Sequence, residues 1–276
     1  LNGNQSCATC HAPAAGWTGP DTAINAQGSV YEGSVPGAFG DRKPPSSAYA
    51  TPSPILHYVM EEDALLFVGG NFWDGRATGE RLGGPAAEQA QGPFLNPAEQ
   101  ALPSPGAVIS GICSSSYVTS FLQVCGTEAC GAGNVSQAYD CVGYAVAAYE
   151  GSAESNAYTS KYDAYLAGTA RLTKQERLGF NLFKGKGKCA ACHVLDGNGR
   201  GLARGVRRDG GPLFTDFTFD NLGIPKNPAN PQGLGYTDQG LGGFLQGGVG
   251  DLVQLRRQQS GRHQRRPQPD QRDDQR

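Results

Sequence analysis

Apolar residues recur at helical spacing in two parts of the chain. Residues 108–152 read as two helices around a glycine-rich loop, and the second helix has its apolar positions at Val142, Ala145, Val146 and Tyr149. A third helix is predicted after a short linker, because Thr173 and Glu176 match a capping box. Its apolar face comprises Leu178, Leu182 and Phe183. The pattern favours helices separated by long loops.

Polar patterning dominates the end of the chain. From about residue 255 it consists almost entirely of Gln, Arg, Asp and Pro. Such a segment cannot bury enough apolar surface to offset its ordering entropy, so we expect a solvated polar tail. No run of eighteen apolar residues occurs, and a transmembrane helix is not expected. The 41 glycines and 18 prolines fit extensive loops around a bulky cofactor or disulfides.

Charge and cysteine content indicate which partners and which cellular compartment to expect. The 276 residues are enough for two domains, and the net charge of −2 implies no nucleic-acid partner. Eight cysteines with one methionine favour an oxidising compartment such as the bacterial periplasm. Because Leu1 is not an initiator methionine, we expect that a signal peptide has been removed.

Four of the cysteines form a repeated motif. Cys-x-x-Cys-His occurs at Cys7, Cys10 and His11, and again at Cys189, Cys192 and His193. This motif attaches c-type haem: two thiols add to the vinyl groups, and the adjacent His ligates the iron. The alternatives are a redox dithiol, a zinc half-site or a disulfide. Each would have to account for a His that directly follows the second Cys in both copies of the motif. Zinc would also need more ligands, and the remaining histidines are His57 and His263. We therefore predict two covalently bound haem c groups.

The other four cysteines lie in the predicted helical hairpin. If both helices form, Cys113 and Cys125 are about 18 Å apart along one axis, too far for a disulfide. An antiparallel hairpin between Cys125 and Cys130 would bring Cys113 level with Cys141. The predicted pairs are therefore Cys113 with Cys141 and Cys125 with Cys130.

Longer motifs resemble the bacterial dihaem cytochrome c peroxidase and MauG family. They are "NFWDGRATGERLGGPAAEQAQGPFLNPAEQ", "LTKQERLGFNLFKGKGKCAACH", "PLFTDFTFDNLGIPKNP" and "DQGLGGF", in the family's order. The resemblance implies a mainly α fold of two cytochrome c-like haem domains, with long loops and little β structure. The N-terminal domain would cover residues 1–168 and the C-terminal domain residues 169–276.

The resemblance implies different roles for the two haems. The haem at His11 is similar to the peroxidatic haem, and the one at His193 to the electron-transferring haem. Trp73 corresponds to the tryptophan between the haems, an alternative being an ordinary core aromatic. Glu99 corresponds to the distal acid-base carboxylate, with Gln89 and Pro93 at the family's spacing ahead of it. Arg76 could bind a haem propionate or form a salt bridge with Asp74.

The same resemblance implies the partners. They are hydrogen peroxide, a small electron-donor protein such as a c-type cytochrome or a cupredoxin, and a second copy of the chain in a homodimer. Family members bind a calcium ion between the domains, but Lys43 stands near the position of its usual asparagine.

The chain departs from the family at the distal iron ligands. No His follows the first motif before His57, so His57 and Met60 are the candidate distal ligands of the first iron. His57 could equally be a core residue at a helix start, and Met60 a core residue. No Met follows Met60, which leaves His263 as a nitrogen candidate for the second iron. Tyr236 is a further candidate there.

Three functions follow from these features. The first is a periplasmic peroxidase that reduces hydrogen peroxide to water with electrons from a small redox protein. The second is a dihaem electron carrier with both irons six-coordinate and no peroxidase activity. The third is a MauG-like oxidant of a partner protein.

Overall fold

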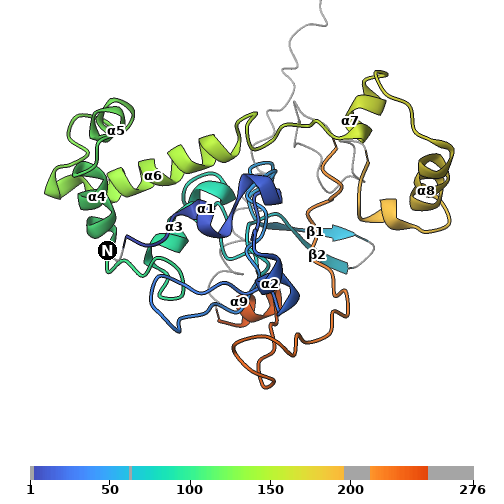
Figure 1. The fold of residues 1–276 in the computed structure, drawn as a ribbon, viewed down its shortest axis with the longest axis horizontal. Helices are drawn as coiled ribbons and strands as arrows, with labels where there is room; N and C mark the ends of the chain where they lie inside the picture. The colour runs from blue at the N-terminus through green and yellow to red at the C-terminus, as the bar shows by residue number, and fades with distance from the viewer. Residues whose placement is uncertain (1–2, 62–63, 196–211, 248–276) are drawn as a thin grey trace, which may run out of the picture.

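The computed structural model describes residues 3–61, 64–195 and 212–247 (Figure 1). Helices outnumber strands in this part of the chain, and long loops connect them. The elements of the first half are α1 (Cys7–Cys10), η1 (Pro13–Ala15), α2 (Thr22–Ala26), β1 (His57–Glu61), β2 (Ala64–Val68) and α3 (Pro85–Leu95). They are followed by α4 (Pro105–Cys113), α5 (Val118–Cys125), η2 (Ala132–Asn134), α6 (Val135–Glu150), α7 (Lys161–Leu166), α8 (Lys174–Lys184), η3 (Cys189–Ala191) and α9 (Leu241–Gly247).

The hydrophobic core lies where α6 packs on α3 and α4 (Figure 1). Gly143 of α6 faces the backbone carbonyl of Ala87 so closely that a Cβ atom would collide with it. This glycine lets the two helices approach, and the hydroxyl of Tyr139 donates a hydrogen bond to the Gln91 carbonyl at 2.5 Å. The buried residues of this core are Leu102, Val108, Ile109, Ala129, Ala138, Tyr139 and Val142.

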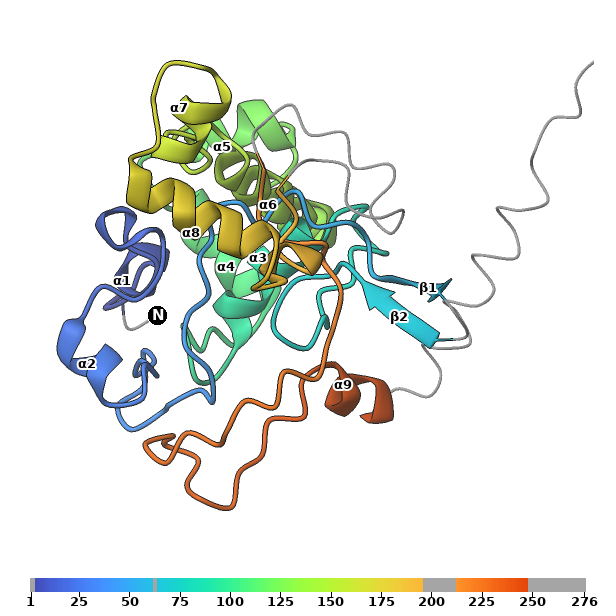
Figure 2. The same cartoon turned by 90° about the vertical axis from the view of Figure 1, so that its right-hand side faces the viewer.

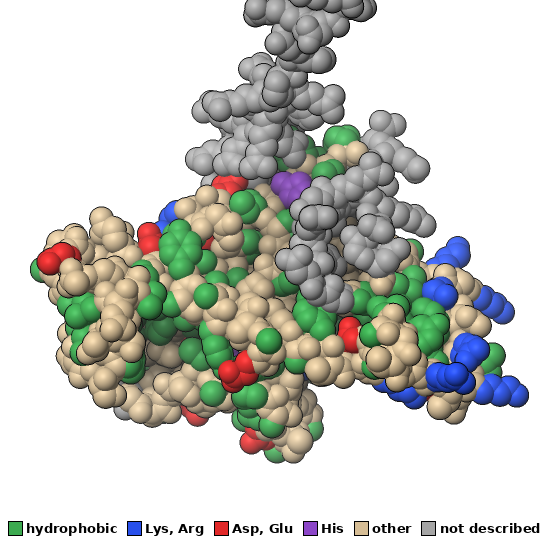
Figure 3. Space-filling model, turned by 90° about the horizontal axis from the view of Figure 1, so that it is seen from above, with side chains coloured by type: hydrophobic (Ala, Val, Ile, Leu, Met, Phe, Trp, Pro, Cys, Tyr) green, Lys and Arg blue, Asp and Glu red, His purple; other side chains and the backbone are tan. Residues whose placement is uncertain are grey.

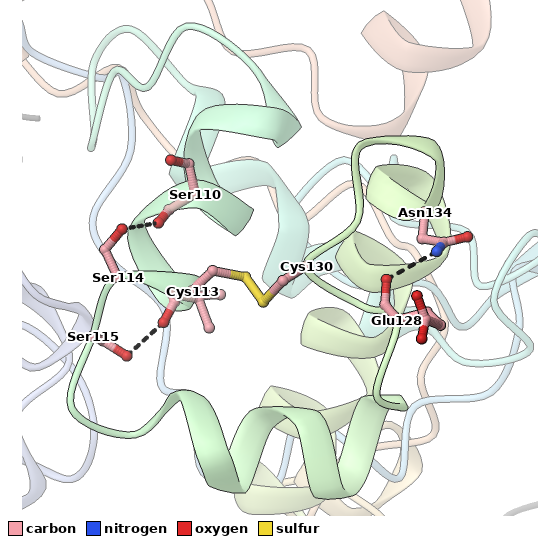
Figure 4. Close-up of a disulfide and its surroundings, with 8 residues drawn as sticks. Ser110, Cys113, Ser114, Ser115, Glu128, Cys130 and Asn134 are labelled. Atoms are coloured by element: carbon pink, nitrogen blue, oxygen red, sulfur yellow. Dashed lines mark hydrogen bonds between the residues drawn. A yellow bond between two sulfur atoms is a disulfide. The ribbon is translucent and has the colours of Figure 1, made fainter.

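The predicted disulfide pairing is wrong. One bond joins Cys113 to Cys130 (Figure 4), and the other joins Cys125 to Cys141. The reason is local, because the first predicted helix is two helices, α4 and α5, bent by 120°. The hydroxyl of Ser114 donates to the Ser110 carbonyl, and that of Ser115 to the Ile112 carbonyl.

Those serine hydroxyls compete with the next helical backbone hydrogen bonds, so α4 ends at Cys113. Since α5 then leaves in another direction, the eleven residues between Cys113 and Cys125 do not lie along one axis. The prediction assumed one continuous helix from Cys113 to Cys125. Those two cysteines do not pair with each other, as predicted, but the nested partners predicted for them are wrong.

The predicted helix before the second cysteine motif is confirmed as α8. The Thr173 hydroxyl accepts a hydrogen bond from the Glu176 backbone N–H at 3.2 Å, and the Glu176 carboxylate accepts one from the Thr173 N–H at 2.6 Å. This is the capping box expected from the sequence. The expected domain boundary at residue 168 falls between α7 and α8 and stays a prediction.

β1 and β2 form an antiparallel hairpin, with His57 opposite Val68. The helix start expected at His57 is therefore wrong, because His57 begins strand β1, which pairs with β2. A later segment extends the hairpin: Phe219 N–H donates to the Phe67 carbonyl at 3.0 Å.

The segment that follows returns to the first half of the chain. Asn230 donates to the Asp41 carbonyl at 2.8 Å, and Asn227 donates to the Gly28 carbonyl at 3.1 Å. Figure 2 shows this loop running beneath the β hairpin to α9. Among the described residues, no single helix is long and apolar enough to cross a membrane; α4 and α5 reach that length only as a bent pair.

Candidate functional site

The first cysteine motif forms a single helical turn. α1 carries Cys7 and Cys10, and the His11 N–H donates to the Cys7 carbonyl at 2.9 Å. Neither thiol forms a disulfide. The His11 Nδ1 atom lies 3.2 Å from the Trp17 carbonyl oxygen and 3.2 Å from Ser47 Oγ. Because a carbonyl can only accept, Nδ1 carries the hydrogen and Nε2 keeps its lone pair.

The second motif repeats this arrangement on a different element. η3 carries Cys189, and the His193 N–H donates to the Cys189 carbonyl at 2.9 Å. Cys189 and Cys192 are both free thiols. His193 Nδ1 donates to the Phe214 carbonyl at 2.9 Å. Both imidazoles are thus fixed with Nε2 available as a metal ligand, the usual arrangement for a ligating histidine.

The surroundings of His193 test whether a haem fits there. Large apolar side chains are exposed on α8 and beside it, with Leu178 at 58 % and Leu182 at 56 % of their surface. Rings of Phe183 and Phe214 lie 6.1 Å apart at their centroids, and Phe183 also lies 6.2 Å from the His193 ring. Free thiols, an available imidazole and exposed apolar side chains fit a haem. Among the described residues, no three His, Cys, Asp or Glu side chains cluster to hold a bare metal ion, which disfavours the zinc alternative.

Glu99 lies close enough to the first motif to interact with it electrostatically. Burial raises the pKa of Glu99, and the hydrogen bond from Asn96 and the electrostatic effects of His11 and Arg76 offset this only in part. The Asn96 side-chain amide donates to Glu99 Oε1 at 2.6 Å. Burial and the charge of Glu99 in turn raise the pKa of the Cys10 thiol. Glu99 and Arg76 therefore lie within electrostatic range of each other and of the His11 motif, whereas the acid-base role of Glu99 stays a prediction.

Gln89 does not join this group directly. It lies on α3, partly buried, and no hydrogen bond links it to Glu99 in the described part of the chain. Pro93 lies within the same helix, shortly before α3 ends at Leu95.

Of the two alternatives for Arg76, the salt bridge with Asp74 is present in the structure. The Arg76 Nη1 atom lies 2.8 Å from Asp74 Oδ2, and its guanidinium lies 3.7 Å from the centre of the Phe72 ring. Trp73 exposes 55 % of its surface, so the alternative of a buried core aromatic is wrong. A Cβ atom on Gly240 would lie 3.4 Å from Trp73 Nε1. Trp73 thus lies against the segment that returns from the second half.

Arg42 links that returning segment to Asp74, the residue after Trp73. Arg42 Nη1 donates to Asp74 Oδ2 at 2.7 Å, and its Nε donates to Asp238 Oδ2 at 2.6 Å. Burial acts to raise the pKa of Asp74, but the hydrogen bonds from Arg42 and then Arg76 outweigh it and lower that pKa. Sequence reasoning missed Arg42, because nothing in the local sequence marks a loop arginine as the link between distant aspartates.

The candidate distal ligands lie on or near the β hairpin. His57 Nδ1 lies 2.8 Å from the Ile55 carbonyl oxygen, and Met60 on β1 is 64 % exposed. Met60 is therefore not a core residue, and that alternative to iron ligation is wrong. The Tyr236 hydroxyl donates to Asp41, and burial followed by that hydrogen bond raises its pKa. His263 and the polar tail lie outside the described residues.

A basic surface surrounds the second motif. Residues 169–195 contain six cations and one carboxylate, and all six cations are exposed. Figure 3 shows Lys and Arg side chains gathered at one end of the molecule. We call this group the basic collar; it comprises Arg171, Lys174, Arg177, Lys184, Lys186 and Lys188.

Comparisons with known proteins agree with the site. The family described as di-haem cytochrome c peroxidase matches residues 1–171. Methylamine utilization protein MauG of Paracoccus denitrificans (strain Pd 1222) is 33 % identical over 246 residues, covering 87 % of this chain and 58 % of the relative. Cytochrome-c peroxidase IdrP1 of Denitromonas iodatirespirans is 26 % identical over 228 residues, covering 82 % of this chain and 47 % of the relative.

A solved structure is similar as well. The crystal structure of the diheme peroxidase BthA from Burkholderia thailandensis E264 has a TM-score of 0.73 and 31 % identity, covering 91 % of this chain and 56 % of that chain. The chain therefore spans about half the length of these relatives. The family implies haem cofactors and oxidoreductase chemistry. By its family match, and with two equivalent cysteine and histidine motifs, the chain belongs to the di-haem cytochrome c peroxidase family.

Proposed function

We propose that this protein reduces hydrogen peroxide to water with electrons from a small redox protein. The observation that carries the proposal is Glu99, a largely buried carboxyl that interacts electrostatically with His11 in a chain of this family. Haem c, attached through Cys7 and Cys10 at one site and Cys189 and Cys192 at the other, supplies the redox chemistry when bound.

The chain's own residues move the proton. Cleaving the O–O bond of peroxide requires a proton to pass from one oxygen to the other, and the second oxygen then leaves as water. Glu99 accepts that proton and returns it. Burial supports this role because it raises the pKa of Glu99 and makes the carboxylate a stronger base than a solvated one. Asn96 holds the carboxylate in place through its 2.6 Å hydrogen bond.

Electrons enter at the His193 site and leave at the His11 site in this proposal. Trp73 is the bridging aromatic, and its contact with the segment at Gly240 supports that placement. The basic collar favours an acidic donor, such as a c-type cytochrome or cupredoxin with an acidic face. Two disulfides support an oxidising location, the periplasm.

The test uses the haem-loaded protein, reduced by one electron and supplied with peroxide and a reduced donor. Glu99→Gln keeps the size of the side chain but removes the base, and we expect turnover to fall by about 10²-fold or more. Glu128→Gln, which removes an exposed carboxylate, is the control and should retain wild-type turnover. Wild-type turnover in Glu99→Gln would refute the role of Glu99. A half-reduced protein without any five-coordinate iron would refute peroxide reduction itself and favour the electron carrier.

The identity to MauG favours a second candidate function, oxidation of a partner protein. In that case peroxide would be consumed without a donor, and the oxidising equivalents would pass to a protein side chain. Stoichiometric peroxide consumption with no donor, together with a covalent change in a partner, would distinguish it from donor-dependent turnover.

A further inference from the structure

A tryptophan lies directly behind the histidine of the first motif. The Trp17 carbonyl accepts hydrogen bonds from His11 Nδ1 at 3.2 Å and from the Ser47 backbone N–H at 3.1 Å. Trp17 has the left-handed backbone conformation, with φ at 62°, which residues other than glycine rarely adopt. The fold therefore keeps this residue behind His11 against its conformational preference.

The Trp17 ring contacts a tyrosine at the end of α6. The Trp17 and Tyr149 rings meet edge-on at 74°, and their centroids lie 5.8 Å apart. This separation is within the range of about 4.5–7 Å that is typical of aromatic rings in contact. Trp17 is partly buried, whereas Tyr149 exposes 47 % of its surface. Two touching rings therefore connect the residue behind His11 to the molecular surface.

The Tyr149 hydroxyl has a proton acceptor beside it. It donates a hydrogen bond to Glu154 Oε1 at 2.8 Å, and this hydrogen bond raises the pKa of Tyr149. The phenol therefore carries its proton at neutral pH, while the ionised carboxylate can only accept one. A phenol that loses an electron becomes strongly acidic. Tyr149 can pass its proton to Glu154 at that moment, so it is easier to oxidise than a phenol without a neighbouring base.

The second motif has a different arrangement. The ring paired with His193 is Phe183, and the carbonyl bonded to its Nδ1 atom belongs to Phe214. Tyr162 lies beyond Phe214, with 5.4 Å between the ring centroids. Phenylalanine has no ionisable proton and is much harder to oxidise than tryptophan or tyrosine. Rings that are readily oxidised therefore lead directly from the first motif, whereas phenylalanines come first at the second.

We propose that Trp17 and Tyr149, with Glu154 as proton acceptor, form a route by which the His11 site oxidises small phenols at the surface when no donor protein is bound. We call these three residues the aromatic route. This inference rests on the proposed function, because hydrogen peroxide must first react at the His11 site. It adds a second reductant and a second place where electrons enter.

The electrons and protons of the proposed reaction balance. One hydrogen peroxide takes up two electrons and two protons and becomes two water molecules. Tyr149 supplies one electron at a time through Trp17, and its phenolic proton passes to Glu154 and then to solvent. A phenol restores Tyr149 after each step by giving up one electron and one proton. Two phenols are thus oxidised to phenoxyl radicals for each peroxide.

The test uses the haem-loaded protein, treated with peroxide without a donor protein and without a phenol. Electron paramagnetic resonance of freeze-quenched samples detects a tyrosyl radical, and a nitroso spin trap followed by peptide mapping locates it. We expect the radical on Tyr149 and its loss in Tyr149→Phe, which keeps the ring against Trp17. Trp17→Phe should lower the yield several-fold, although its contacts with His11 and Ser47 persist because the backbone carbonyl makes them.

Glu154→Gln separates proton transfer from packing. The amide cannot take up the proton, so the radical should form more slowly by about tenfold or more. Formation in wild type should also slow in heavy water, and this isotope effect should disappear in Glu154→Gln. A purely structural role of Glu154 would leave the isotope effect unchanged, and that result would overturn its place in the route.

Tyr144→Phe is the matched control, because Tyr144 lies on the same helix and is 49 % exposed. It should keep both the radical and the peroxide-dependent oxidation of a phenol such as guaiacol. Tyr149→Phe should lose phenol oxidation but keep turnover with the donor protein. A radical on Tyr144 or Tyr162 instead of Tyr149 would overturn the aromatic route. Turnover with the donor but no radical on Tyr149 would overturn this inference alone, whereas a wild-type protein that does not react with peroxide would refute the proposed function as well.

Discussion

At the residue scale, two carboxyls define the chemistry around His11. Glu150 and Glu99 both act electrostatically on Cys7 of the motif. Both carboxyls have raised pKa values because both are buried. Only Glu99 could be found from the sequence, since a family motif surrounds it. Glu150 is the last residue of the amphipathic helix α6, and the pattern of that helix does not mark it as buried.

Glu150 also predicts how stability depends on pH. Its pKa is 4.5 when unperturbed and about 7 in the folded protein. Between these values the folded protein keeps the proton and the unfolded chain loses it, so the free energy of unfolding falls as pH rises. The loss from this one group is on the order of 2–3 kcal/mol. It is complete at pH 8 and absent below pH 4.5.

Urea denaturation of wild type and Glu150→Gln over this pH range measures the effect. The raised pKa of Glu99 also lowers the free energy of unfolding as pH rises. The informative quantity is therefore the difference in the free energy of unfolding between wild type and Glu150→Gln at each pH. That difference should change between pH 5 and pH 8. An identical slope in both proteins would contradict the assignment of a raised pKa to Glu150.

At the scale of elements, α8 and η3 present the second motif within the basic collar. α8 buries none of its residues, yet it carries both apolar and cationic side chains. The Lys184 Nζ atom lies 4.1 Å from the centre of the Phe180 ring, so one of the cations packs along the helix. The capping box that begins α8 is local, which is why the sequence predicts this helix well. The function of the α8 surface depends on which partner protein docks there.

The collar predicts a salt-dependent reaction with an acidic donor. Opposite charges steer association, and salt screens them over about 10 Å at 0.1 M ionic strength. The rate of electron transfer from an acidic donor should fall about tenfold or more between low and physiological salt. Changing Lys184, Lys186 and Lys188 together to Gln should weaken both the rate and its salt dependence.

Stopped-flow reduction of the His193 haem measures that rate. Lys43→Gln removes an exposed lysine outside the collar and is the control. If the triple variant and Lys43→Gln had the same salt dependence, the collar would not be the donor's docking surface.

At the scale of the whole molecule, Arg42 joins distant parts of the chain. It binds Asp74, next to Trp73, and Asp238, in the segment that returns from the second half. The Arg42 and Asp74 side chains are only 22 % and 12 % exposed. Their ion pairs are therefore screened less than surface pairs.

Arg42→Gln should destabilise the protein and loosen the returning segment. Removing one partner leaves Asp74 largely buried with a single cation, and we expect a loss of about 2 kcal/mol in the free energy of unfolding. Faster hydrogen exchange should appear at residues 227–240. Lys161→Gln breaks the exposed pair with Glu176, at 47 % and 42 % exposure, and should cost much less than Arg42→Gln. Equal losses in the two variants would contradict this role for Arg42.

The sequence by itself determined what depends on neighbouring residues. The two cysteine motifs and the capping box of α8 are local patterns, and each is present in the structure. The helix predicted at α6 is also present, but its predicted apolar face is wrong in part: Val142 is buried, whereas Ala145 and Tyr149 are exposed. The family's motifs similarly located Glu99 next to the first motif. Local chemistry is enough for such features, because hydrogen bonding and periodicity act over a few residues.

Only the tertiary structure decided which distant groups meet. The disulfide partners followed from the bend after Cys113, the strand at His57 from its pairing with β2, and the Arg42 link from a loop that returns across the molecule. Tyr149, near the end of α6, meets the Trp17 ring of the loop after the first motif edge-on. These contacts depend on the path of the backbone through space, and no sequence spacing encodes that path.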